Sequence, residues 1–231
     1  MHYVLFFVML VSLLGLVTVR LLDLAFLGTI LKIITSLFFV ATGIASHKVH
    51  VKHKTYDYLI ILGLVFSLFG DTFLALDGKM TFTFGVISFA VAHIFFTIGF
   101  CHLKKIGWAD VGCFILIFGV LMGILNGCDF NFQNMKVMIM AYTLIISLMV
   151  TKAISLVDYY KENKKAVLLI VIGAVMFLIS DVILVFGLFG VNAWEYLFIL
   201  NLPVYYIGQD LLAISLAFPI DIPSKAALVE K

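Results

Sequence analysis

Apolar residues fill eight long stretches of the chain, and short polar connections separate these stretches. Each stretch approaches the ~20 residues that an α-helix needs to cross the hydrocarbon core of a bilayer. The short connections imply that consecutive helices are antiparallel neighbours. We predict an all-α, polytopic membrane helix bundle with eight transmembrane helices, which forms a single transmembrane domain over residues 1–231. The predicted helices cover about residues 3–19, 24–46, 57–76, 80–102, 109–126, 135–156, 165–187 and 194–217.

The composition agrees with a membrane protein. Of the 231 residues, 64% are hydrophobic and 12% are charged, whereas a soluble domain carries roughly a quarter charged residues. The formal net charge of +2 therefore indicates no nucleic-acid partner. The first apolar stretch has no Lys or Arg before it and no small-residue cleavage site after it, which favours a membrane helix over a cleavable signal peptide. Cys101, Cys113 and Cys128 form no paired motif, so we expect no structural disulfide.

Basic residues are distributed unevenly between the two ends of the predicted bundle. One end carries Arg20, Lys79 and Lys136 in its connections. The other end, which includes both termini, carries eleven lysines: Lys48, Lys52, Lys54, Lys104, Lys105, Lys152, Lys161, Lys164, Lys165, Lys225 and Lys231. Since cytoplasmic loops are enriched in Lys and Arg, we expect both termini in the cytoplasm. The expected location is a bacterial inner membrane, or the endoplasmic reticulum in a eukaryote, and the oligomeric state stays open.

Two predicted helices place an aspartate among apolar residues. Asp71 lies in "LVFSLFGDTFLAL" (64–76), and Asp181 lies in "AVMFLISDVILVF" (174–186). An ionisable group inside the bilayer costs roughly 2.5–3.5 kcal/mol even on insertion scales, and such groups mark functional sites. The structural alternative is an ion pair between one aspartate and Lys32, but this would leave the second carboxylate unpaired. We therefore predict that both aspartates act together.

The surroundings of the two aspartates are similar. In both helices a glycine lies eight residues before the aspartate and a leucine lies three residues after it: Gly63, Asp71 and Leu74 in one, Gly173, Asp181 and Leu184 in the other. A parallel repeat of four plus four helices would explain this similarity. Chance is the alternative for so short a match.

Further polar residues are spaced to share faces of the predicted helices. Asn201, Tyr205 and Gln209 follow one another at intervals of four, as do Lys32 with Ser36 and His93 with Thr97. We expect these faces to line a pocket between the middle of the bilayer and its outer surface. His93 as a packing residue and Asn201 as an interhelical hydrogen-bonding residue are open alternatives. Asp210 lies deeper and is not assigned to the pocket.

The segment "HKVHVKH" gathers His47, His50 and His53. It lies in a lysine-rich connection that would repel a divalent cation, and Asp57 is the nearest carboxylate in the sequence. We expect neither a metal site nor a cofactor.

Taken in order, these motifs resemble the YhhN-like family of membrane proteins, the lysoplasmalogenases. The resemblance covers nearly the whole chain. Its elements are Lys32, "GLVFSLFGD" with Asp71, "GVISFAVAHIFF" with His93, "FLISD" with Ser180 and Asp181, and "YYIGQ" with Tyr205, Tyr206 and Gln209. The sequence departs from the family in having no proline after Lys32 and in having Phe96 where the family has tyrosine.

The resemblance implies hydrolysis of the vinyl-ether bond of a lysoplasmalogen, which yields a fatty aldehyde and glycerophosphocholine or glycerophosphoethanolamine. The substrate is then a lysophospholipid, Asp71 and Asp181 are the catalytic pair, and Lys32, His93, Tyr205, Tyr206 and Gln209 bind substrate. Protonation of a vinyl ether gives an oxocarbenium ion, so this chemistry needs one protonated and one ionised carboxyl group. Two alternatives are a proton-coupled transporter that uses the intramembrane aspartates and a scaffold without catalysis.

Overall fold

The computed structural model of the protein describes residues 1–49, 53–76, 78–159, 161, 163–194 and 196–221. The described chain is all-helical, without a strand, and eight of its helices are long and apolar enough to cross a membrane. They are α1 (His2–Leu21), α2 (Ala25–His47), α3 (Lys54–Leu74), α4 (Lys79–Leu103), α5 (Trp108–Gly127), α6 (Lys136–Ser155), α7 (Lys164–Phe189) and α8 (Leu197–Ser215). Short 3-10 turns flank α6 at Gln133–Met135 and Leu156–Tyr159.

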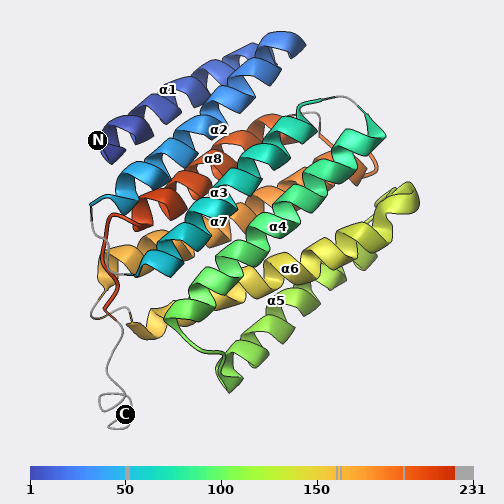
Figure 1. Ribbon diagram of the computed structural model, residues 1–231. Coiled ribbons are helices and arrows are strands. Elements are labelled where there is room, and N and C mark those ends of the chain that lie inside the picture. The colour runs from blue at the N-terminus through green and yellow to red at the C-terminus, as the bar shows by residue number, and fades with distance from the viewer. Residues whose placement is uncertain (50–52, 77, 160, 162, 195, 222–231) are drawn as a thin grey trace.

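The predicted fold class is confirmed, and each predicted helix end lies within three residues of the observed one. Hydropathy locates the helices well because in a bilayer the backbone must satisfy its own hydrogen bonds throughout each apolar stretch. Eight antiparallel helices bring Met1 and the end of α8 to the same end of the bundle (Figure 1). Which side of the membrane this end faces stays a prediction.

The helices form a bundle with α1 and α5 at opposite flanks (Figure 1). Each helix packs on its neighbour in sequence within the first four and within the last four helices. The two groups are joined by α4 on α6 and by contacts of α8 with α1, α2 and α3. Exchanging the first four helices with the last four turns α2–α8 into α4–α6, but α1–α8 and α3–α8 have no comparable counterpart in α4–α5 or α4–α7. The internal repeat stays a prediction, because packing order is not a superposition of coordinates.

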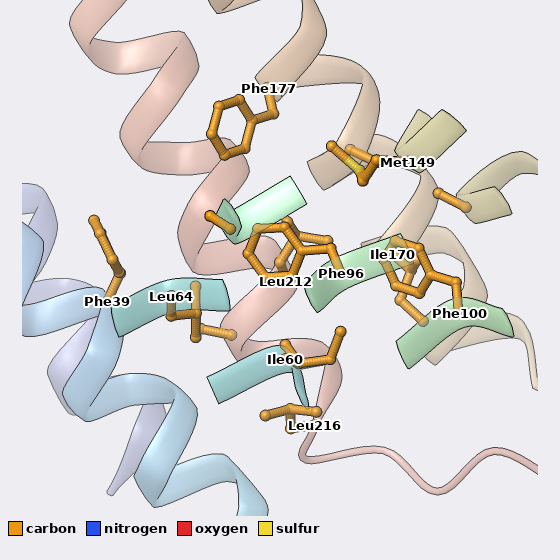
Figure 2. Packing of buried hydrophobic residues seen from close by; sticks show 14 of the residues in the cluster. Phe39, Ile60, Leu64, Phe96, Phe100, Met149, Ile170, Phe177, Leu212 and Leu216 are labelled. Atoms are coloured by element: carbon orange, nitrogen blue, oxygen red, sulfur yellow. The ribbon is translucent and has the colours of Figure 1, made fainter. Parts of the chain in front are cut away.

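Large apolar side chains fill the centre of the bundle (Figure 2). Phe96 and Phe177 are fully buried there, from α4 and α7. Close contacts between helix backbones hold the layers together. A Cβ atom on Gly173 would lie 2.8 Å from the carbonyl oxygen of Gly208, so α7 and α8 meet where neither residue has a side chain. Small residues of this kind allow tight packing of membrane helices.

A buried ion pair attaches α5 to the rest of the bundle near the end that carries the termini. Lys152 Nζ of α6 lies 2.8 Å from Asp110 Oδ2 of α5, and both side chains are at most 5% exposed. The same carboxylate accepts a hydrogen bond of 3.1 Å from the backbone N–H of Gly107. Breaking such a pair would leave an uncompensated buried charge, so it fixes how α5 is seated on α6.

Candidate active site

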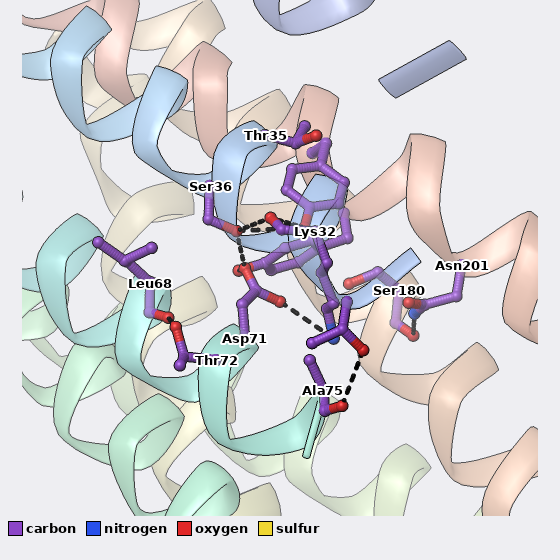
Figure 3. Close-up of polar contacts among 12 residues, drawn as sticks. Lys32, Thr35, Ser36, Leu68, Asp71, Thr72, Ala75, Ser180 and Asn201 are labelled. Carbon is purple, nitrogen blue, oxygen red and sulfur yellow. Dashed lines mark hydrogen bonds and ion pairs between the residues drawn. The ribbon is translucent and has the colours of Figure 1, made fainter. Parts of the chain in front are cut away.

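Asp71 lies in the last turn of α3 and is 1% exposed. Three groups converge on its carboxylate, two of which, Lys32 and Ser36, are labelled in Figure 3. Lys32 Nζ lies 3.3 Å from Oδ1. The hydroxyls of Ser36 and Tyr205 each donate a hydrogen bond of 2.7 Å to Oδ2. One ammonium group and two hydroxyl donors favour the ionised form of a carboxyl group, so these partners offset part of the cost of burying a charge at Asp71.

Tyr206 contacts two neighbours of Asp71 and not Asp71 itself. Its hydroxyl is 3.1 Å from Ser36 Oγ and donates to the backbone carbonyl of Lys32 at 3.1 Å. The side chain is fully buried. Tyr206 therefore fixes the face of α2 that carries Lys32 and Ser36, and does not reach Asp71 itself.

Asp181, in α7, has a different set of partners. The Tyr142 hydroxyl of α6 donates a hydrogen bond of 2.7 Å to Asp181 Oδ2. His93 Nε2 lies 2.8 Å from the same hydroxyl and 3.5 Å from the carboxylate. Since the phenol proton points to Asp181, the contact to His93 requires a hydrogen on Nε2. His93 of α4 thus donates to the Tyr142 hydroxyl of α6, which in turn donates to Asp181 of α7.

Both carboxylates line one small cavity of about 30 Å³. That is room for about one or two water molecules. The cavity opens toward a larger one of about 350 Å³ at the end of the bundle opposite the termini. The shared lining residues are Lys32, Leu74, Leu184, Asn201 and Leu202. The two aspartates predicted from sequence thus line one pocket, which is narrow within the bundle and wide at the end of the bundle opposite the termini.

Asp181 also borders two apolar cavities of about 30 and 40 Å³. One lies among α5, α6 and α7, where Leu121, Leu125, Ile146 and Val185 contribute to its wall. The other is bounded by α3, α4, α6 and α7. The Asp181 side chain is 15% exposed, against 2% for that of Asp71. Asp181 therefore stands at a boundary between polar and apolar space.

Two residues of the cavity wall, Ser180 and Asn201, bond to helix backbone, and two other polar residues, Gln209 and Asp210, do not line the cavity. Ser180 donates to the Phe177 carbonyl of its own helix, and Asn201 donates to the Ser180 carbonyl across the α7–α8 contact. Gln209 is fully buried near the Tyr205 hydroxyl but forms no hydrogen bond with a described residue. Asp210 is fully buried and does not line the cavity.

The histidine-rich connection is used for local contacts where it is described. His47 Nδ1 lies 2.8 Å from Asp57 Oδ2, and His53 Nε2 lies 2.9 Å from the Ile220 carbonyl oxygen. His50 lies outside the described residues. No group of three or more His, Cys, Asp or Glu side chains suited to a metal ion occurs in the described part of the chain.

Tyr142 is the residue that sequence reasoning missed. A tyrosine within an apolar span is unremarkable by itself, yet a signal was present. The offset of 110 residues that relates Asp71 to Asp181 also relates Lys32 to Tyr142. Each member of this second pair contacts the aspartate of its own half. Applying the offset to Lys32 would have identified Tyr142.

No curated protein sequence and no solved structure matches the chain significantly. The model of the YhhN family matches residues 27–216, a region that contains both aspartates and every partner described for them above. Because this match covers well over half of the chain, the protein belongs to the YhhN family.

Proposed function

We propose that the protein is a lysoplasmalogenase, an ether hydrolase that cleaves the vinyl-ether bond of a lysophospholipid. The YhhN family includes lysoplasmalogenases. The observation that carries the proposal is the cavity shared by Asp71 and Asp181, which is open toward one membrane surface and bordered by apolar space. A single-chain lipid has its vinyl ether just below its polar head, so this bond would reach the two carboxylates.

The different partners of the two aspartates suggest different roles. Asp71 has Lys32 and two hydroxyl donors, which suits a carboxylate that stays ionised. Asp181 has no lysine or arginine partner among the described residues and borders apolar cavities, which suits a carboxyl group that carries a proton. We therefore assign Asp181 as the general acid and Asp71 as the group that stabilises the cation and accepts a proton from water.

The proposed reaction begins when Asp181 transfers its proton to the β-carbon of the vinyl ether. The double bond becomes a single bond, and an oxocarbenium ion forms next to the Asp71 carboxylate. Water adds to the α-carbon while Asp71 accepts its proton. The resulting hemiacetal then collapses to a fatty aldehyde and the alcohol of the glycerophospho compound. The sum is one ether and one water giving one aldehyde and one alcohol.

Aldehyde release from purified protein tests the proposal. Detergent-solubilised protein should form free aldehyde from 1-alkenyl-glycerophosphocholine or 1-alkenyl-glycerophosphoethanolamine, and should not form it from the saturated alkyl ether. The proposal is wrong if the wild-type protein releases none from either head group. Lys32, His93 and Tyr205 are proposed to hold the polar part of the substrate or the aspartates around it, with Tyr206 and Gln209 supporting them.

A proton-coupled transporter remains the competing function. Such carriers build midplane sites from interrupted helices. Here α3 and α7, which carry the aspartates, are continuous, and Pro203 lies inside α8 without dividing it. Substrate flux that occurs only in sealed vesicles, without product formation in detergent, would favour the transporter.

A further inference from the structure

The larger cavity at the end of the bundle has a second basic residue in its wall besides Lys32. Arg20 lies in the last turn of α1 and is exposed at its end of the bundle. Its side chain leans over α2 at Gly28, where a Cβ atom would lie 3.0 Å from Arg20 Nε and 3.2 Å from Cζ. The absence of a side chain at Gly28 thus leaves the space in which the guanidinium group lies beside the cavity.

The two cations of this cavity differ in their partners. Lys32 is paired with Asp71 at 3.3 Å, so its charge is compensated. Arg20 forms no ion pair with a carboxylate among the residues that the structure describes. Among the residues that the structure describes, no carboxylate offsets this charge at the mouth of the cavity. The guanidinium group that carries it has a planar set of donors that matches a phosphate.

The positions of these groups along α2 set their depth. Gly28, Lys32 and Ser36 follow one another at intervals of four and share one face of the helix. Four residues of α-helix rise about 6 Å. The guanidinium of Arg20, at the level of Gly28, lies about one turn closer to the membrane surface than the ion pair of Lys32 with Asp71. One glycerol unit separates a phosphate from a vinyl ether over a comparable length.

We propose that Arg20 binds the phosphodiester of the lipid head group and so selects phosphorylated lysolipids as substrates. The assignment rests on the proposed function of the site. In this assignment Arg20 binds the phosphate, while Lys32 stays paired with Asp71. A merely structural Arg20, which interacts with the carboxyl end of the α1 helix dipole or with the interface, would have no preference for one substrate over another.

Two single-chain substrates separate these roles: 1-alkenyl-glycerophosphocholine and 1-alkenylglycerol, which lacks the phosphate. Arg20→Gln should lower kcat/KM for the phosphorylated substrate about 10–100-fold, chiefly through KM, because a charge-assisted contact is lost. The kcat/KM of Arg20→Gln for 1-alkenylglycerol should change less than about threefold. Arg20→Lys keeps the charge without the bidentate geometry. Its kcat/KM for the phosphorylated substrate should lie between those of the wild-type protein and Arg20→Gln. Lys136→Gln, an exposed lysine at the same end of the bundle, is the control.

A binding measurement makes the result independent of catalysis. The saturated alkyl-glycerophosphocholine should bind the wild-type protein more tightly than alkylglycerol in calorimetric titrations, and Arg20→Gln should remove this preference. If the variant keeps the preference, or if it weakens both ligands equally, Arg20 is not the phosphate site. A preference that depends on Arg20 without any aldehyde release would uphold the site and refute the hydrolase. Glycerophosphocholine has the same head group but no chain. If it displaced alkyl-glycerophosphocholine as effectively as the lipid itself does, the assignment to a lipid head group would be overturned.

Discussion

Tyr142 donates a hydrogen bond of 2.7 Å to Asp181 across the contact between α6 and α7. Lys32 approaches Asp71 in the equivalent way across the contact between α2 and α3. A phenol therefore faces one aspartate, and an ammonium group faces the other. Two carboxylates with related positions in the sequence are thereby given unlike environments, which is how acid and base roles are separated in one site.

Replacing either aspartate with asparagine should abolish hydrolysis. Asp71→Asn and Asp181→Asn keep the size of the side chain and remove proton transfer, so the rate of aldehyde release should fall about 10²–10⁴-fold. Asp210→Asn is the matched control, because Asp210 is a buried aspartate of the same bundle outside the cavity. It should retain turnover. An Asp71 or Asp181 variant with more than about a tenth of the wild-type rate would exclude that residue as an essential group.

Tyr142→Phe tests the donor to Asp181. The variant loses one hydrogen bond to a carboxyl group, and kcat should fall about 10–100-fold with little change in KM. Tyr58→Phe removes a hydroxyl from a tyrosine that is 54% exposed and outside the cavities, and should leave kcat unchanged. Equal kcat values for the Tyr142 variant and wild type would show that Asp181 acts without this phenol.

Lys32→Met should weaken both folding and turnover. The substitution leaves Asp71 buried without its cation, and breaking such a pair costs about 3–5 kcal/mol of folding free energy. The Tm in detergent should fall accordingly. The double variant Lys32→Met/Asp71→Asn should recover most of the Tm without recovering activity, since no unpaired charge remains. Lys136→Met is the control for loss of an exposed lysine. A double variant no more stable than Lys32→Met would argue against the ion pair.

The side from which the head group enters can be measured with single cysteines. Replacing Cys101, Cys113 and Cys128 gives a background without free thiols. Leu188→Cys, in the wall of the larger cavity, should react with an impermeant thiol reagent from the non-cytoplasmic side, and saturated alkyl-glycerophosphocholine should protect it. Lys161→Cys, exposed at the opposite end, should react from the cytoplasmic side. The reverse pattern would invert the predicted orientation.

The sequence predicted the helices closely and the site in part, for a physical reason. Hydropathy reports how long each apolar stretch is and how deep a polar residue lies, but not which neighbour its face meets. Lys32 was found because a charged group at that depth needs a partner, and Tyr205 because it shares a helix face with Asn201 and Gln209. Tyr142 was missed because a tyrosine is tolerated in a span without one. Arg20 was taken as a loop charge, and its direction over Gly28 depends on how α1 packs on α2.

The position of Asp181 between a polar mouth and apolar cavities would separate the two products after bond cleavage. A fatty aldehyde formed there would partition into the bilayer, while the glycerophospho compound would leave into water on the side of the mouth. The two products would enter different phases at the moment of separation. Recombination would then be disfavoured by dilution into two solvents, and a downstream enzyme that consumes the aldehyde would have to work at or within the membrane.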